Sequence, residues 1–270
     1  MTRIEHLVEI EAALTNPDYS DREFTAEEIT AGVHRTFIGG SWDTHGKRQL
    51  DFLTAQGLLP GHRLIDIGCG CFRAGRHFID YLEPGNYYGI DANHSLIKAG
   101  YDVELSDEQR RKVPAEHLRA NDRFNVDFGV TYDYAIANSV FSHVSLNHIR
   151  LCLYRLNAVM EPGGSFYATF FARGKSTPLD FVRSTKKGKA YFTEKNLFWY
   201  YPSDLKWASS FGSWEFEYIG DWGHPAGQRM ARFTRLDDAR PAVAPPRPAP
   251  STDLISRGRR WAARKIDPAR

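Results

Sequence analysis

The segment Arg63-Leu-Ile-Asp66-Ile-Gly68-Cys-Gly70 joins an apolar run to a pair of glycines. This pattern predicts a buried strand that ends in a glycine-rich turn and opens a helix. Glycine lets the backbone approach a ligand closely, and the free amides at a helix N-terminus attract the polar groups of that ligand. In an open α/β sheet, such a turn is a binding place for a nucleotide-like cofactor.

An acidic residue follows at the end of the next predicted strand. Asp91 closes the run Tyr87-Tyr-Gly-Ile-Asp91, and it lies about 20 positions after the glycines, where a carboxylate that takes ribose hydroxyls is expected. A nicotinamide-binding loop would have a third glycine at position 73, where this chain has Arg73. The glycine turn therefore departs from the nicotinamide-binding pattern.

The sequence Asp-x-Gly-x-Gly, followed by Asp91, resembles motif I of the class I methyltransferases that use S-adenosyl-L-methionine (SAM). The resemblance runs from roughly Gly39 to Arg235, and it includes residues 133–143 and Met160-Glu-Pro-Gly-Gly164. It implies an α/β fold with a Rossmann-like, seven-stranded, mostly parallel sheet flanked by helices. It also implies SAM as the cofactor.

The resemblance assigns roles to single residues of the cofactor site. Gly68 and Gly70 would wrap the methionine part of SAM, Asp66 would shape the turn, and Asp91 would hold the ribose. The other implied contacts are Ala92 and Asn93 near the adenine, Asp122 at the adenine amino group, Asn138 beside the sulfonium, and Arg73 on the methionine carboxylate. For Asp122 the alternative is an exposed turn residue.

Two histidines are candidates for proton transfer. Methyl transfer from a sulfonium is an in-line displacement that needs alignment, and a hydroxyl acceptor must also lose its proton to a base. His143 comes five residues after the predicted fourth strand and is the first candidate, although it could instead cap the next helix. His224, in the loop between Trp222 and Gln228, is the second. No compact metal-ligand motif is present, so no metal site is predicted.

The acceptor is predicted from two further features of the sequence. Twelve aromatic residues lie between Tyr191 and Trp222, and such rings suit a sugar or a ring-bearing acceptor. Methyltransferases that act on exocyclic amines or amides resemble one another in an Asn/Asp-Pro-Pro-Tyr/Phe sequence, whose prolines are missing from Asn138-Ser-Val-Phe141. We therefore expect transfer to a hydroxyl of a small molecule, a sugar or glycosylated metabolite.

These residues are expected in a chain of three parts. Residues 1–57 form a helical preface or lid that includes the capping box Thr25-Ala-Glu-Glu28, and residues 58–240 form the methyltransferase domain. The strand-like runs 214–222 and 228–235 would form a hairpin at the sheet edge, or one of them would slot inside the sheet. Residues 241–270 are predicted to be a flexible, proline-rich tail with seven arginine and lysine residues against two aspartates.

The composition of 42% apolar and 25% charged residues is ordinary for a soluble globular protein. No secretory signal or long apolar run is present, and the three cysteines cannot form a disulfide framework, so we expect a cytoplasmic protein.

Two alternatives to a small-molecule methyltransferase stay open. One is a nucleic-acid methyltransferase, which a net charge of only +2 disfavours. The other is a SAM-fold binding protein whose basic tail contacts a membrane or a protein. The oligomeric state is not predicted.

Overall fold

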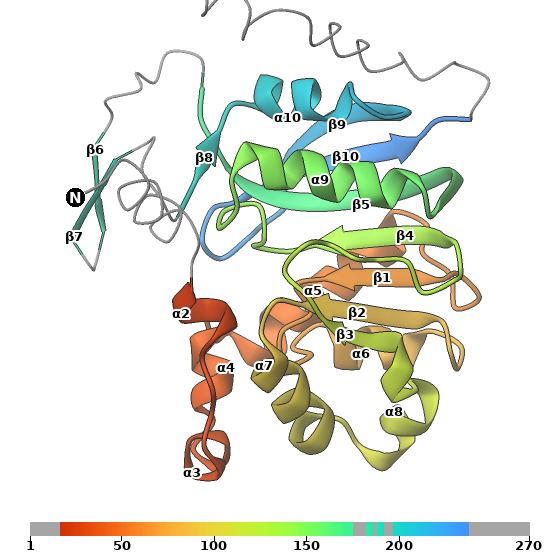
Figure 1. Cartoon of the computed structure of the whole chain (residues 1–270). Coiled ribbons are helices and arrows are strands. Elements are labelled where there is room, and N and C mark those ends of the chain that lie inside the picture. The colour runs from red at the N-terminus through yellow and green to blue at the C-terminus, as the bar shows by residue number, and fades with distance from the viewer. Residues whose placement is uncertain (1–16, 175–181, 186–187, 192–196, 238–270) are drawn as a thin grey trace, which may run out of the picture.

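The computed structural model describes residues 17–174, 182–185, 188–191 and 197–237 (Figure 1). Its centre is a sheet with the strand order β3 (Leu118–Ala120), β2 (Tyr87–Asp91), β1 (Leu64–Ile67), β4 (Tyr132–Ala137), β5 (Met160–Ala172), β10 (Arg229–Arg235) and β9 (Trp214–Asp221). An eighth strand, β8 (Trp199–Tyr200), pairs with the end of β5. The predicted Rossmann-like, mostly parallel sheet is confirmed.

The direction of the strands determines where a ligand can bind. Strands β1 to β5 run parallel, and β10 is antiparallel to both β5 and β9. All residues of β1 and β2 are buried, as expected for central strands covered on both faces. The chain passes from β1 outwards to β2 and β3 and then returns to β4 beside β1. Ligands of such sheets bind at this switch point, outside the carboxyl ends of the strands.

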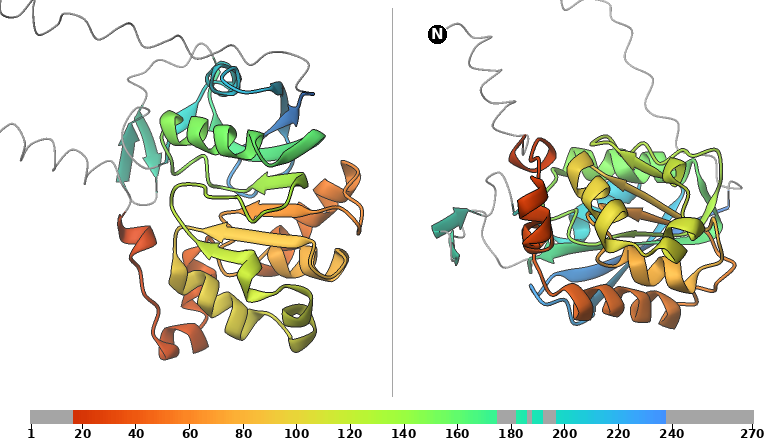
Figure 2. Two further views of the ribbon diagram at one scale, coloured as in Figure 1. Left: turned by 45° about the vertical axis from the view of Figure 1, so that its right-hand side comes forward. Right: turned by 90° about the horizontal axis from the view of Figure 1, so that it is seen from below.

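Helices cover both faces of the sheet (Figure 2): α5 (Trp42–Ala55), α6 (Gly75–Tyr81) and α7 (His94–Ala99) on one, α9 (Leu146–Asn157) and α10 (Pro202–Ser209) on the other. Each face has its own apolar core. Leu53 and Phe78 are buried in the first core, and Leu153 and Leu205 are buried in the second. Both faces of the sheet are therefore closed, which leaves its carboxyl edge for the site.

Within the described residues, three short helices precede α5: α2 (Pro17–Ser20), α3 (Ala26–Thr30) and α4 (Val33–Phe37). The predicted capping box is confirmed, because Thr25 and Glu28 exchange side-chain hydrogen bonds with each other's backbone amides. Phe24 packs with Cys71 and Leu96, so this N-terminal part contacts the glycine turn and α7 (Figure 1). The helical pattern predicted in residues 2–15 and the predicted tail 241–270 lie outside the described residues.

The hairpin prediction left two arrangements open, and the structure combines them. β9 and β10 form an antiparallel pair, and β10 slots between β5 and β9. Several short elements were not predicted: a π-helical turn at Gly100–Glu104, α8 (Asp107–Lys112), a 3-10 turn at Ala115–His117, α10, β8, and a separate pair of strands, β6 (Val182–Thr185) and β7 (Gly188–Tyr191). Such elements are too short for hydrophobic periodicity to identify them.

No helix within the described residues is long and apolar enough to cross a membrane.

Candidate active site

The turn after β1 depends on glycine. Gly68 and Gly70 have φ angles of 76° and 55°, which residues with a Cβ atom rarely adopt. A Cβ atom on Gly68 would lie 2.4 Å from Cγ2 of Val140, so the turn packs directly on the segment after β4. Beneath it, the buried Asp66 accepts a hydrogen bond of 2.9 Å from the Tyr87 hydroxyl. Burial raises the pKa of Asp66 to about 7.

Asp91 is held against the glycine turn, at the carboxyl end of β2. Its Oδ2 atom accepts a hydrogen bond of 2.9 Å from the Gly70 amide, and its Oδ1 atom accepts one of 2.8 Å from the Asn93 amide. Burial raises the pKa of Asp91 to about 6. Asn93 caps α7 by accepting from the Leu96 amide, with Ala92 between the two site residues. The structure thus brings the two motif segments together.

An N-terminal segment covers this carboxylate, and we call residues 19–24 the strap. The Tyr19 hydroxyl donates to Oδ2 of Asp91 at 3.2 Å. The side-chain amide of Asn93 donates to the carbonyl oxygens of Tyr19 and Arg22. Burial, together with the charge of Asp91, raises the pKa of Tyr19 well above its usual value, so its hydroxyl remains a donor. The Tyr19 hydroxyl of the strap therefore occupies one of the acceptor positions on Oδ2 of Asp91.

At the carboxyl end of β4, Ser139 adopts a left-handed backbone conformation with φ 63°. Its Oγ atom lies 3.2 Å from Nε2 of His224 and accepts a hydrogen bond of 3.2 Å from the Gln228 side chain. Nδ1 of His224 accepts from the Ala226 amide at 3.1 Å. A neutral imidazole with its Nδ1 lone pair engaged carries its hydrogen on Nε2. His224 therefore donates to Ser139.

His224 is neutral at physiological pH. Burial, together with the positive charges of Arg73 and Arg48, lowers the pKa of its imidazole to about 4. Its only basic lone pair is engaged by a backbone amide, which favours a hydrogen-bonding role over the predicted proton-accepting one. The role of His224 as a second base stays a prediction.

The structure adds His45 to the site, a residue that sequence reasoning missed. The Asn138 side-chain amide donates to Nε2 of His45 at 3.1 Å, and the His45 ring centre lies 4.7 Å from that of His224. Burial, and then the charge of Arg73, lowers the pKa of His45 to about 3. His45 precedes Asn138 by 93 positions. No local pattern could therefore have joined them. We call His45, Asn138, Ser139 and His224 the polar cluster.

Arg73 connects the glycine turn to the segment before α5. One of its terminal nitrogens donates to the carbonyl oxygens of Ile38 and Gly40, at 3.0 and 2.8 Å. Its buried Nε atom has no hydrogen-bond partner among the described residues. Burial lowers the pKa of Arg73, and the guanidinium stays charged at neutral pH.

Asp122 and His143 are exposed at the same edge of the sheet. The Asn121 side chain shapes the turn around Asp122 by accepting from the amides of Arg123 and Asn125, both at 2.9 Å. His143 lies in the loop between β4 and α9, and its amide donates to the Val140 carbonyl at 2.9 Å. The roles of Asp122 and His143 stay predictions.

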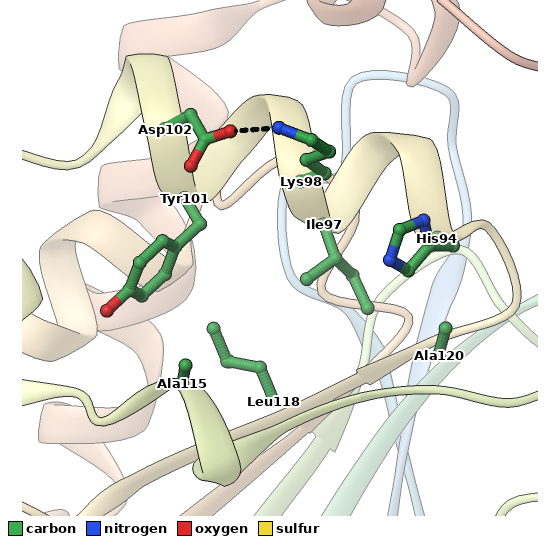
Figure 3. Close-up of a pocket in the computed structure, with 8 residues that line it drawn as sticks. All are labelled: His94, Ile97, Lys98, Tyr101, Asp102, Ala115, Leu118 and Ala120. Carbon is green, nitrogen blue, oxygen red and sulfur yellow. Dashed lines mark hydrogen bonds and ion pairs between the residues drawn. The ribbon is translucent and has the colours of Figure 1, made fainter.

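Two surface grooves flank the site. The first, of about 390 Å³, runs between α7 and β3 (Figure 3). Ile97 and Leu118 give it an apolar lining, and Lys98 and Asp102 form an ion pair at its rim. The second, of about 310 Å³, lies between the end of β5 and the start of α10. Neither includes the glycine turn, where the strap and Ile38 pack. We place the site at that turn because its hydrogen-bonding groups converge there.

Within the described ranges, no three His, Cys, Asp or Glu side chains are grouped so that they could hold a metal ion.

A doubly wound sheet with a glycine turn after its first strand and a carboxylate after its second has the architecture of proteins that bind adenosine cofactors. Residues 65–166 match the family model described as a methyltransferase domain. The chain therefore carries a SAM-dependent methyltransferase domain with the class I fold. SAM is the cofactor of this family.

Solved structures with the same fold include several bacterial proteins. DesVI of Streptomyces venezuelae is 15% identical, with a TM-score of 0.54 over 77% of this chain and 98% of that one. CalS10, an amino pentose methyltransferase from Micromonospora echinaspora solved with SAM bound, is 17% identical, with a TM-score of 0.54 over 80% of this chain and 99% of that one. The sugar N-methyltransferase KedS8 from a Streptoalloteichus species is 14% identical, with a TM-score of 0.54 over 75% and 92% of the two chains. At these identities, the likeness establishes the fold.

The residues at the turn fit SAM. The absence of side chains at Gly68 and Gly70 leaves bare backbone at this turn, and the Asp91 carboxylate is an acceptor of the kind that ribose hydroxyls need. The buried Oδ1 atom of Asn138 has no hydrogen-bond partner among the described residues, and it is an acceptor suited to an ammonium group.

Proposed function

We propose that this SAM-dependent methyltransferase transfers the methyl group to a hydroxyl of a small molecule, a sugar or a glycosylated metabolite. The observation that carries the proposal is the pair Ser139 and His224 of the polar cluster, at the carboxyl end of β4. The missing prolines after Asn138 and the aromatic residues of the C-terminal half support a hydroxyl-bearing, ring-shaped acceptor. CalS10, an amino pentose methyltransferase, and KedS8, a sugar N-methyltransferase, share this fold and so support a sugar acceptor.

When bound, SAM supplies an electrophilic methyl group on a positively charged sulfur. We propose that Gly68 and Gly70 wrap its methionine part over Asp66, and that Asp91 accepts the ribose hydroxyls. The further residues proposed to contact the cofactor are Arg73, Ala92, Asn93, Asp122 and Asn138. Gly70 and Tyr19 already donate to Oδ2 of Asp91 and Asn93 donates to Oδ1, so a ribose hydroxyl that donates to Oδ2 requires Tyr19 to release that oxygen. Residues 1–57 would then act as a lid that rearranges around the cofactor.

His143 is the proposed base for the acceptor hydroxyl, since its loop follows β4 directly and its imidazole is exposed. His224 is proposed to orient Ser139. The Ser139 Oγ atom accepts from both His224 and Gln228, which leaves the hydroxyl hydrogen of Ser139 available to a further acceptor. A sugar oxygen next to the methyl group could take this hydrogen bond.

A sugar amine is the second candidate acceptor, favoured by the likeness to CalS10, an amino pentose methyltransferase, and to KedS8, a sugar N-methyltransferase. Pairs of sugars that differ only in a hydroxyl or an amine at one carbon would separate the two proposals. Each pair would be incubated with SAM and the protein, and products would be identified by mass spectrometry as the acceptor plus one methylene. Exclusive methylation of the amino sugars would overturn the hydroxyl proposal.

The cofactor site is tested by isothermal calorimetry with SAM and S-adenosyl-homocysteine. Asp91→Ala should abolish binding, while Glu116→Ala, an exposed acid away from the turn, should leave the dissociation constants unchanged. Equal binding by both variants would overturn the proposed role of Asp91. His143→Ala should keep the SAM affinity and lower kcat for a hydroxyl acceptor about 100-fold or more.

A further inference from the structure

His45 holds a buried hydrogen-bond donor that nothing in the described residues accepts. Asn138 donates its side-chain amide to Nε2 of His45, so that nitrogen must present its lone pair. A neutral imidazole with a lone pair on Nε2 has its hydrogen on Nδ1. The Nδ1 atom is buried and has no hydrogen-bond partner among the described residues. A buried donor without an acceptor is costly, so a ligand group is expected to accept from it.

Other buried polar atoms without a hydrogen-bond partner belong to residues beside His45. One is the Oδ1 atom of Asn138, an acceptor on the side chain that contacts His45. A second is the Nε–H group of Arg73, a donor on a guanidinium close enough to depress the pKa of His45. A third is the indole Nε1–H group of Trp222, whose ring centre lies 5.8 Å from that of His45. With the Nδ1–H group of His45, these atoms comprise three donors and one acceptor. An α-amino acid in its zwitterionic form matches this set, since its carboxylate accepts from donors and its ammonium group donates.

The backbone of α5 explains why His45 can reach this position. A Cβ atom on the next residue, Gly46, would lie 2.1 Å from the carbonyl oxygen of Arg73. Because glycine stands there, α5 packs directly on the backbone that follows the glycine turn. His45 is consequently only 3% exposed and lies between the end of β4 and His224.

We propose that His45 is a cofactor-binding residue, whose Nδ1–H donates to the carboxylate at the methionine end of SAM while Asn138 Oδ1 accepts from the ammonium group. This inference rests on the proposed cofactor site. It assigns to α5 a direct role in holding the amino-acid end of the cofactor. It also assigns a ligand-binding reason to the burial of a neutral imidazole.

Calorimetry with two ligands tests the proposal. S-adenosyl-homocysteine carries the amino-acid end, whereas 5′-methylthioadenosine lacks it. His45→Phe should raise the dissociation constant of S-adenosyl-homocysteine about tenfold to a hundredfold and change that of methylthioadenosine less than about twofold. An equal loss for both ligands, or no loss for S-adenosyl-homocysteine, would overturn the proposal. His62→Phe, at the amino end of β1, is the matched control and should leave both constants unchanged.

Two conservative variants separate ligand binding from mere support of Asn138. The amide of asparagine lies near the position of imidazole Nδ1, and that of glutamine lies near Nε2. His45→Asn should therefore retain most of the S-adenosyl-homocysteine affinity, and His45→Gln should lose it. The reverse order would mean that His45 only positions Asn138. Failure of the unaltered protein to bind any of these ligands would instead overturn the cofactor site itself.

Discussion

At the scale of single residues, Gly68 is under two constraints: its φ of 76° lies in the left-handed region, and the Val140 side chain occupies the space where a Cβ atom would lie. Gly68→Ala is expected to lower the free energy of unfolding by about 2–4 kcal/mol, because left-handed strain and overpacking add. Gly163→Ala is the matched control, since Gly163 has φ 83° and nothing within 4 Å of the added Cβ. Urea denaturation measures both variants. Equal losses would mean that the Val140 contact costs nothing.

Asp66 should make stability depend on pH. Its folded-state pKa of about 7 lies above the ordinary value of 3.8, so the folded protein binds its proton more tightly than the unfolded chain does. The stabilisation is present below pH 4 and is lost as the pH rises to about 7. Asp66→Asn, which can still accept from Tyr87, should remove this component. The free energy of unfolding would be compared at pH 5 and pH 8. Identical pH dependence in both proteins would contradict the raised pKa.

Some site residues were readable from sequence because their signal is local. Asp66, Gly68 and Gly70 lie within five positions, and the structure brings Asp91 against Gly70 as the spacing predicted. His45 had no such signal. A lone histidine on a helix is recognisable as a site residue only when the chain has folded and placed it on Asn138.

At the scale of elements, the strap competes with the proposed ribose contact. Tyr19→Phe removes a hydrogen bond to Asp91 that must break when a ribose hydroxyl donates to Oδ2, so SAM affinity should increase about threefold to tenfold. Calorimetry measures this change, with the exposed Tyr154→Phe as control. Weaker binding in Tyr19→Phe would show that the hydroxyl belongs to the bound state instead.

The strap and the hairpin differ in how far sequence could predict them. The capping box of α3 is a four-residue signal and was predicted. The position of β10 between β5 and β9 was one of two options, because alternation of apolar residues identifies a strand and does not name its neighbours.

At the scale of the whole molecule, the described sheet is complete at Arg235. Truncation after Arg240 is therefore expected to leave the melting temperature within about 2 °C and the S-adenosyl-homocysteine affinity unchanged. Differential scanning calorimetry and binding calorimetry on the full and truncated chains measure both. A large loss of stability would mean that the basic tail packs on the domain. Loss of binding to anionic vesicles alone would support the membrane-contact alternative.

The sequence by itself determined the strands of the main sheet other than β8, the glycine turn, its partner Asp91 and hence the methyltransferase resemblance, because these depend on patterns within a few residues or on a fixed spacing of one βαβ unit. Only the tertiary structure decided which distant groups meet. Tyr19 with Asp91, Ser139 with His224, and Asn138 with His45 are separated by 72, 85 and 93 positions. Such contacts form when helices and strands pack, and packing depends on the whole chain.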